Sequence, residues 1–130
     1  MALFFISVVA YSFVGADQEA KQMTGYWVEM NQQAAYEFLK DHNGNEIDLK
    51  SGTIKNFHWV LSKGTLQLRA GPQPENAPPD TSKASTDFYF HFAKTPQGEE
   101  TLVLNYIKVG WKNVLAGNYD SDRVFVRKSR

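Results

Sequence analysis

The sequence predicts an all-β protein: an antiparallel, up-and-down barrel of about eight strands. Short runs with apolar residues at every second position recur along the chain, which is the pattern of half-buried antiparallel strands. Turn residues rich in Gly and Asn separate these runs. A sandwich would share both features, but the abundant aromatic residues on one side of the runs favour a barrel, whose interior such rings would fill or line.

The first sixteen residues, MALFFISVVAYSFVGA, contain no charged side chain. The apolar run at residues 2–14 is shorter than the roughly 20 residues that span a bilayer, but it has the length of the apolar part of a secretory signal. The small residues of VGA, before Asp17, suit a cleavage site. We therefore expect a signal peptide at residues 1–16, a single domain at residues 17–130, and a secreted or periplasmic protein.

A buried first strand is the alternative for this segment. Ile6, Val8 and Val9 are β-forming residues, and a continuous apolar run fits a strand that is covered on both faces.

Seven further runs carry the strand pattern. They cover residues 24–30, 34–40, 52–62, 64–70, 86–93, 100–109 and 122–128. One face of the third run is expected to hold Phe57, Trp59 and Leu61, whereas the fifth run alternates three phenylalanines with Tyr89 and His91. Helical structure is expected only at residues 16–23, and residues 108–117 fit either a bent strand or a short helix.

The stretch KDHNGNE, residues 40–46, has two interpretations. Asp41, Asn43 and Asn45 have the spacing of the first three ligands of an EF-hand calcium loop. However, Gly44 falls at position four rather than six, and Gly52 occupies the place of the final Glu. We expect instead a type I′ hairpin turn centred on Asn43-Gly44, followed by a return strand.

A long connector at residues 70–85 contains four of the five prolines. Its polar composition predicts a mobile loop rather than a linker, because neither flank is large enough to form a domain alone.

Several of these segments resemble the small bacterial lipocalin-like domains. Gly25-Tyr26-Trp27 matches the G-x-W of the first lipocalin strand, and FHWVLSKGTLQLR, residues 57–69, matches a central hairpin. YEFLKDHNGNEIDL and the closing DRVFVRK are also similar, so that the resemblance covers residues 24–128.

The resemblance implies a barrel base formed by Gly25, Trp27, Arg123 and Arg127, in which one arginine stacks on Trp27 as a cation–π pair. It also implies a binding role without catalysis. Glu29 would need a cationic partner if it points inward, and the same two arginines are the candidates.

The aromatic residues are the candidate ligand-binding site. The members expected in the barrel interior are Trp27, Tyr36, Phe38, Trp59, Phe88, Phe90 and Tyr106. The alternatives are a completely filled core and a cavity for a small apolar ligand. A second hypothesis is a protein-interaction module, such as a secreted inhibitor, that uses the Pro-rich loop at residues 70–85.

Other functions lack support in the sequence. The 14 basic and 14 acidic residues form no basic stripe, so nucleic-acid binding is not expected. Cysteine is absent, and no nucleophile or zinc motif is present. Glu99-Glu100 and Asp120-Ser121-Asp122 lie in polar turns, and the three histidines are expected to face outward. We therefore expect no catalytic residue, no metal and no cofactor.

Overall fold

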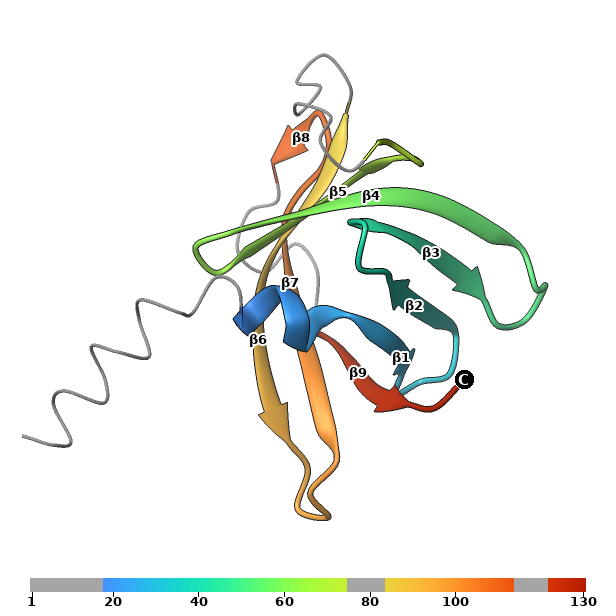
Figure 1. The fold of residues 1–130 in the computed structure, drawn as a ribbon, viewed down its shortest axis with the longest axis vertical. Coiled ribbons are helices and arrows are strands. Elements are labelled where there is room, and N and C mark those ends of the chain that lie inside the picture. The colour runs from blue at the N-terminus through green and yellow to red at the C-terminus, as the bar shows by residue number, and fades with distance from the viewer. Residues whose placement is uncertain (1–17, 75–83, 114–121) are drawn as a thin grey trace, which may run out of the picture.

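The structure is a computed structural model that describes residues 18–74, 84–113 and 122–130 (Figure 1). A short helix at residues 18–23, where helix was expected, precedes the first strand. The strands are β1 (Gly25–Glu29), β2 (Ala34–Phe38), β3 (Asn43–Asp48), β4 (Ile54–Ser62), β5 (Thr65–Ala70), β6 (Ser85–Lys94), β7 (Glu100–Gly110), β8 (Lys112–Asn113) and β9 (Arg123–Lys128).

Eight of these strands close into an antiparallel barrel. Strands β1 to β7 each pair with the next strand in the chain, and β9 pairs with both β7 and β1. The ladder between β1 and β9 joins Tyr26 to Lys128 and Glu29 to Phe125. Among the described residues, the two-residue strand β8 pairs only with Lys108 and Val109 of β7. The predicted up-and-down barrel is thus confirmed, and it is compatible with the lipocalin-like architecture.

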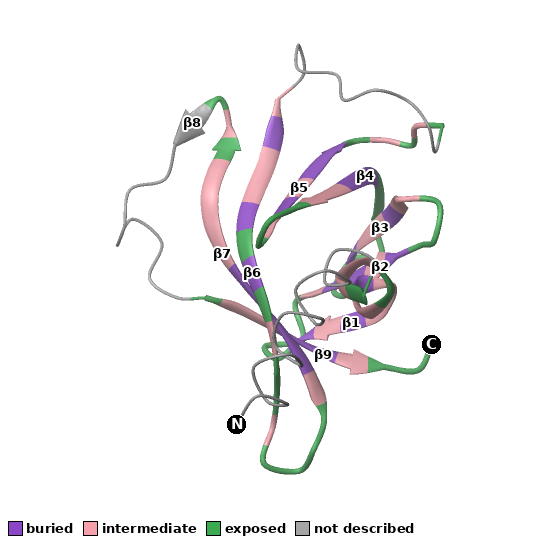
Figure 2. Ribbon diagram, turned by 60° about the vertical axis from the view of Figure 1, so that its left-hand side comes forward, coloured by how far each residue is buried: buried purple, intermediate pink, exposed green. Residues whose placement is uncertain are grey.

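The alternating burial of the strands confirms most of the expected faces (Figure 2). On β6, Phe88 and Phe90 are buried, whereas Tyr89 and His91 between them are exposed. On β5, Leu66 is fully buried and pairs across the sheet with Leu61 of β4.

The closing strand β9 departs from this simple pattern. Phe125 is fully buried and lies between Arg123 and Arg127, which belong to the same, inner face. The arginines of the strand therefore face the barrel interior.

The hairpin between β4 and β5 follows the sequence prediction. Lys63 and Gly64 form its two-residue loop, and both have positive φ angles, of 22° and 78°. This is the backbone that a two-residue hairpin of the I′ type uses.

The predicted Asn43-Gly44 turn is wrong. The loop instead comprises Lys40, Asp41 and His42: the His42 N–H donates to the Leu39 carbonyl, and Leu39 N–H donates to the Asn43 carbonyl. His42, with φ of 66°, adopts the left-handed conformation that closes such a three-residue loop. The Asp41 carboxylate accepts the Asn43 N–H at 3.0 Å, and this hydrogen bond lowers the pKa of Asp41.

Close packing rather than turn geometry explains Gly44. This residue belongs to β3 and pairs with Phe38 on one side and Phe57 on the other. A Cβ atom here would lie 2.5 Å from the Phe57 ring and would collide with the Glu37 carbonyl. The glycine therefore leaves room for the ring of Phe57 inside the barrel.

The predicted signal peptide at 1–16 lies entirely outside the described residues. So do residues 75–83 of the long connector and residues 114–117 of the ambiguous segment. The first part of that segment is strand, since β7 continues to Gly110. Within the described residues, no helix is long and apolar enough to cross a membrane.

Candidate functional site

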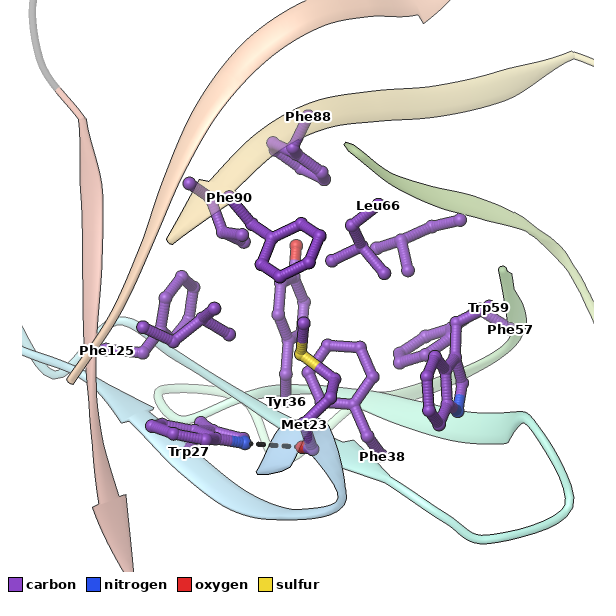
Figure 3. Close-up of a cluster of buried hydrophobic side chains, with 13 residues drawn as sticks. Met23, Trp27, Tyr36, Phe38, Phe57, Trp59, Leu66, Phe88, Phe90 and Phe125 are labelled. Atoms are coloured by element: carbon purple, nitrogen blue, oxygen red, sulfur yellow. Dashed lines mark hydrogen bonds between the residues drawn. The ribbon is translucent and has the colours of Figure 1, made fainter. Parts of the chain in front are cut away.

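The structure brings all seven predicted interior side chains into the barrel. Figure 3 shows six of them, all except Tyr106. Trp27, Tyr36, Phe38, Trp59, Phe88 and Phe90 are buried, and Tyr106 is partly buried against them. Their rings pack directly on one another and on neighbouring phenylalanines: the Tyr36 and Phe125 rings stack at 4.9 Å, and Phe88 and Tyr106 are 4.8 Å apart.

These seven residues divide into two groups. Trp27, Phe38, Trp59 and Phe90 belong to the packed core, whereas Tyr36, Phe88 and Tyr106 also line a cavity. The part of the barrel around Trp27, Phe38, Trp59 and Phe90 is therefore filled by side chains, and the space open to a ligand lies at the other end.

The closed end is built around Trp27. Its indole N–H donates to the Met23 carbonyl at 2.8 Å, so that the short helix covers this end of the barrel. The Arg127 guanidinium lies 4.2 Å from the indole centroid, which is the cation–π geometry that the resemblance implies. Arg127 also donates to the carbonyls of Thr24 and Gln22, and it pairs with Glu100 at 3.0 Å.

Gly25 fits beneath the same arginine. Its φ of +132° is a conformation that favours glycine, and a Cβ atom would lie 2.5 Å from Arg127 Nη1. Gly25, Trp27 and Arg127 therefore meet at the barrel base, whereas Arg123 does not join them.

Arg123 lies instead among the polar groups at the open end. Its Nε and Nη2 donate to the two carboxylate oxygens of Glu29 at 2.9 and 3.1 Å, which confirms the expected partner for this buried acid. Its Nη1 donates to the hydroxyl oxygens of Tyr36, at 2.8 Å, and of Tyr106, at 3.3 Å. The Tyr36 hydroxyl in turn donates to Glu46 at 3.1 Å.

This network shifts two pKa values. Burial raises the pKa of Tyr36, and the nearby Arg123 opposes that rise without cancelling it. Burial disfavours the charge of Arg123, but the hydrogen bonds to Glu29, together with the electrostatic effects of Tyr36, Tyr106 and Glu29, outweigh burial and raise the pKa of the guanidinium. At neutral pH the tyrosine is therefore neutral and the arginine is charged.

A cavity of about 380 Å³ opens above this network. Its floor is aromatic and aliphatic, and includes Tyr36, Phe57, Leu68 and Phe88. Its polar lining includes Glu46, Lys55, Arg69 and Arg123, and both ends of the long connector, Ala70 and Ala84-Ser85, form part of its rim.

A second cavity of about 370 Å³ adjoins the first, because both are lined by Glu46, Lys55 and Arg123. The remaining lining of the second cavity is largely polar and includes the carboxylates of Glu29 and Asp48.

Glu46 and Lys55 were not among the residues predicted to form a ligand site. Strand register provides the signal: Tyr36 lies opposite Glu46, and Glu46 lies opposite Lys55, so that the three share the inner face of β2, β3 and β4.

The histidines do not all face solvent as predicted. His91 is exposed, but His58 is only 7% exposed although it points away from the aromatic core. The loop between β2 and β3 covers it: His58 Nδ1 lies 3.3 Å from Asn43 Oδ1, and the His42 ring centroid is 6.4 Å away. Burial, followed by the nearby His42, lowers the pKa of His58.

Asn43 also fixes the start of the long connector. Its side-chain amide donates to the Gln73 carbonyl at 2.8 Å, and its Oδ1 accepts the Gln73 N–H at 2.8 Å. The oxygens whose spacing matches a calcium loop thus take part in hydrogen bonds within the protein.

The candidate carboxylate pairs are not arranged for acid–base catalysis. Glu99 pairs with Lys128 at 3.0 Å and Glu100 with Arg127, both near the surface. Asp122 accepts a hydrogen bond from Asn105, whereas Asp120 lies outside the described residues. The described part of the chain also contains no group of three or more His, Asp or Glu side chains that could hold a metal ion.

Comparisons with known proteins add no relative. No family model matches the chain, and no curated protein or solved structure matches it significantly.

Proposed function

We propose that this protein is a lipocalin-like binding protein, without catalysis, that holds a small, partly apolar ligand at the open end of its barrel. The observation that carries the proposal is the cavity of about 380 Å³, which combines an aromatic floor with a polar rim. Its volume lies within the range of small-molecule sites, and such sites usually combine an apolar lining with a few polar groups.

The packing of the core determines where the ligand would lie. Trp27 and Trp59 are fully buried and packed against other rings, so the space between them is taken. The apolar body of the ligand would instead rest on Phe57, Leu68 and Phe88, and its polar groups would face the rim.

A substitution that fills the cavity tests this proposal. Thr86 lines the cavity, and its partner across the sheet is Leu68, so the side chain of Thr86→Trp would occupy the site. The matched control is His91→Trp, which adds the same ring to the exposed side of the same strand. The neutral fluorescent probe N-phenyl-1-naphthylamine should bind the wild type and His91→Trp, and it should lose binding to Thr86→Trp.

Circular dichroism and thermal melting must first show that both variants fold like the wild type. Equal binding of the probe to Thr86→Trp and to the wild type would exclude the cavity as the binding site. A wild-type protein that binds neither this probe nor its anionic analogue, 8-anilinonaphthalene-1-sulfonate, would contradict the proposal as a whole.

A protein-interaction role through the long connector is the second candidate. The hydrogen bonds between Asn43 and Gln73 hold the start of the connector against the barrel, and a fixed base favours presentation of a segment to a partner. Replacing residues 75–83 by a Gly/Ser segment of equal length should abolish capture of a partner and leave the melting temperature unchanged. Unchanged capture of that partner would refute this candidate.

Secretion is a further part of the proposal, supported by the uncharged, apolar residues 1–16. N-terminal sequencing of the mature protein should find Asp17 as the first residue; an intact Met1 would contradict secretion through a cleaved signal peptide.

A further inference from the structure

The cavity at the open end has an uneven distribution of charge. Of its described lining residues on the inner face of the barrel, two carry positive charge and one carries negative charge: Lys55, Arg123 and Glu46. Arg69 lies opposite His58 in the β4–β5 ladder, so its side chain belongs to the outer face. The adjoining cavity shares Lys55 and Arg123 but is lined by three carboxylates, those of Glu29, Glu46 and Asp48.

Most of these charges already have partners. Arg123 is held by both oxygens of Glu29, and Arg69 donates to Gln67 at 2.8 Å. Glu46 accepts the hydrogen bond of Tyr36.

The side chain of Lys55 differs from these. Lys55 lies opposite Glu46 in the β3–β4 ladder and lines both cavities, but its ammonium group forms no ion pair or hydrogen bond with any residue of the described ranges. Its charge contributes to lowering the pKa of Asp48, after the backbone hydrogen bonds from Ser51 and Lys50. The side chain is exposed, so the ammonium group can reach a ligand without first breaking an ion pair or hydrogen bond. A ligand that binds it therefore gains a charged hydrogen bond at little cost.

The aromatic floor and the excess of positive charge occur on the same side of Lys55. The cavity that contains Phe57 and Phe88 is the one in which cations outnumber carboxylates, whereas no aromatic residue among those described lines the acidic cavity. A ligand whose apolar body rests on these rings thus brings its polar end next to the ammonium group of Lys55.

We infer that the ligand of the cavity is an amphipathic anion, whose acidic group binds Lys55 and whose apolar body lies on Phe57 and Phe88. This inference rests on the proposed function, because it specifies the chemistry of the same site. A carboxylate and a sulfonate share the recognised chemistry, which is a negative group attached to a flat or chain-like apolar body.

Two fluorescent probes that share one ring system test the inference. 8-Anilinonaphthalene-1-sulfonate carries the negative group, and N-phenyl-1-naphthylamine lacks it. The wild type should bind the sulfonate more tightly, and Lys55→Gln should weaken sulfonate binding by roughly fivefold, because an exposed charged contact contributes about 1 kcal/mol. Binding of the neutral probe should not change.

Lys50→Gln is the matched control. Lys50 is exposed in the turn between β3 and β4 and lines none of the cavities described above, so this substitution should affect neither probe. Added salt should weaken sulfonate binding to the wild type more than to Lys55→Gln.

The outcomes separate the two proposals. If the wild type binds the neutral probe as tightly as the sulfonate, or if Lys55→Gln affects both probes equally or neither of them, the anionic ligand class is wrong and the binding site remains. If the wild type binds neither probe, the proposed function fails together with the inference.

Discussion

The ion pair between Glu29 and Arg123 should be a principal determinant of stability at the open end of the barrel. The side chains are 9% and 18% exposed, and two hydrogen bonds of 2.9 and 3.1 Å join them. Glu29→Gln keeps the shape of the side chain but removes its charge. It therefore leaves the Arg123 charge in a largely buried position without its counter-ion.

The expected loss follows from this geometry. Removing one partner of a buried pair costs about 3–5 kcal/mol. Arg123 retains its hydrogen bonds to Tyr36 and Tyr106, and the glutamine oxygen can still accept one hydrogen bond. We therefore expect a decrease in the free energy of unfolding of about 3 kcal/mol, which corresponds to a melting temperature lower by roughly 10 °C for a domain of this size.

Urea unfolding, followed by circular dichroism, measures this loss as a lower transition midpoint at an unchanged slope. Glu99→Gln is the control, because Glu99 and Lys128 form an ion pair of similar length, 3.0 Å, with side chains that are 45% and 49% exposed. It should cost about 0.5 kcal/mol or less. If Glu29→Gln costs no more than Glu99→Gln, the buried pair is not a principal determinant of stability.

Three further substitutions test other parts of the fold. Gly44→Ala should lower the free energy of unfolding by about 3 kcal/mol, because the added Cβ collides with the Phe57 ring and a backbone carbonyl. A urea midpoint of the variant equal to that of the wild type would contradict this collision. Arg127→Lys should cost about 1–2 kcal/mol, since lysine cannot both stack on Trp27 and donate to two carbonyls, and a loss below about 0.5 kcal/mol would be evidence against that role. The pKa of His58 lies below its usual 6.5, so the folded protein resists protonation of this side chain. The free energy of unfolding should therefore fall as the pH decreases from about 6.5 through that lower pKa. Urea midpoints measured at pH 7 and pH 5 would show this loss. His58→Gln should reduce this pH dependence, and an unchanged dependence would exclude His58 as its source.

Local sequence patterns were sufficient to predict the strands and most of their faces. The alternation of Phe88 and Phe90 with Tyr89 and His91 depends on the period of two in a strand, which neighbouring residues alone reveal. The Lys63-Gly64 turn was predictable for the same reason, since its two residues must adopt positive φ.

The hairpin between β2 and β3 was not predictable from local preference. Asn-Gly is a favoured turn pair, but Gly44 is needed where Phe38 and Phe57 converge inside the barrel. A turn at Asn43-Gly44 would have placed Ser51, rather than Glu46, opposite Tyr36. With that incorrect register, Glu46 is not placed at the cavity. Only the tertiary packing of the hairpin determines the correct register.

The two arginines of β9 illustrate a similar limit. Arg123 and Arg127 lie on the inner face, four residues apart. From the sequence alone, either one could be the partner of Trp27 or of Glu29. The ladder places Arg127 opposite Trp27, which leaves Arg123 for Glu29. Pairing between distant strands decides this assignment, and no pattern within β9 reveals it.

The ladder between β1 and β9 has a consequence for synthesis of the protein on the ribosome. Its residues are far apart in the chain: Arg123 and Glu29, for example, are separated by 94 positions. Strands β1 to β7 can pair successively as they emerge, but β1 has no second neighbour, and Trp27 no cation above it, until β9 has left the exit tunnel. Until then the nascent chain exposes two unpaired strand edges, and this interval is when a chaperone would protect it most from aggregation.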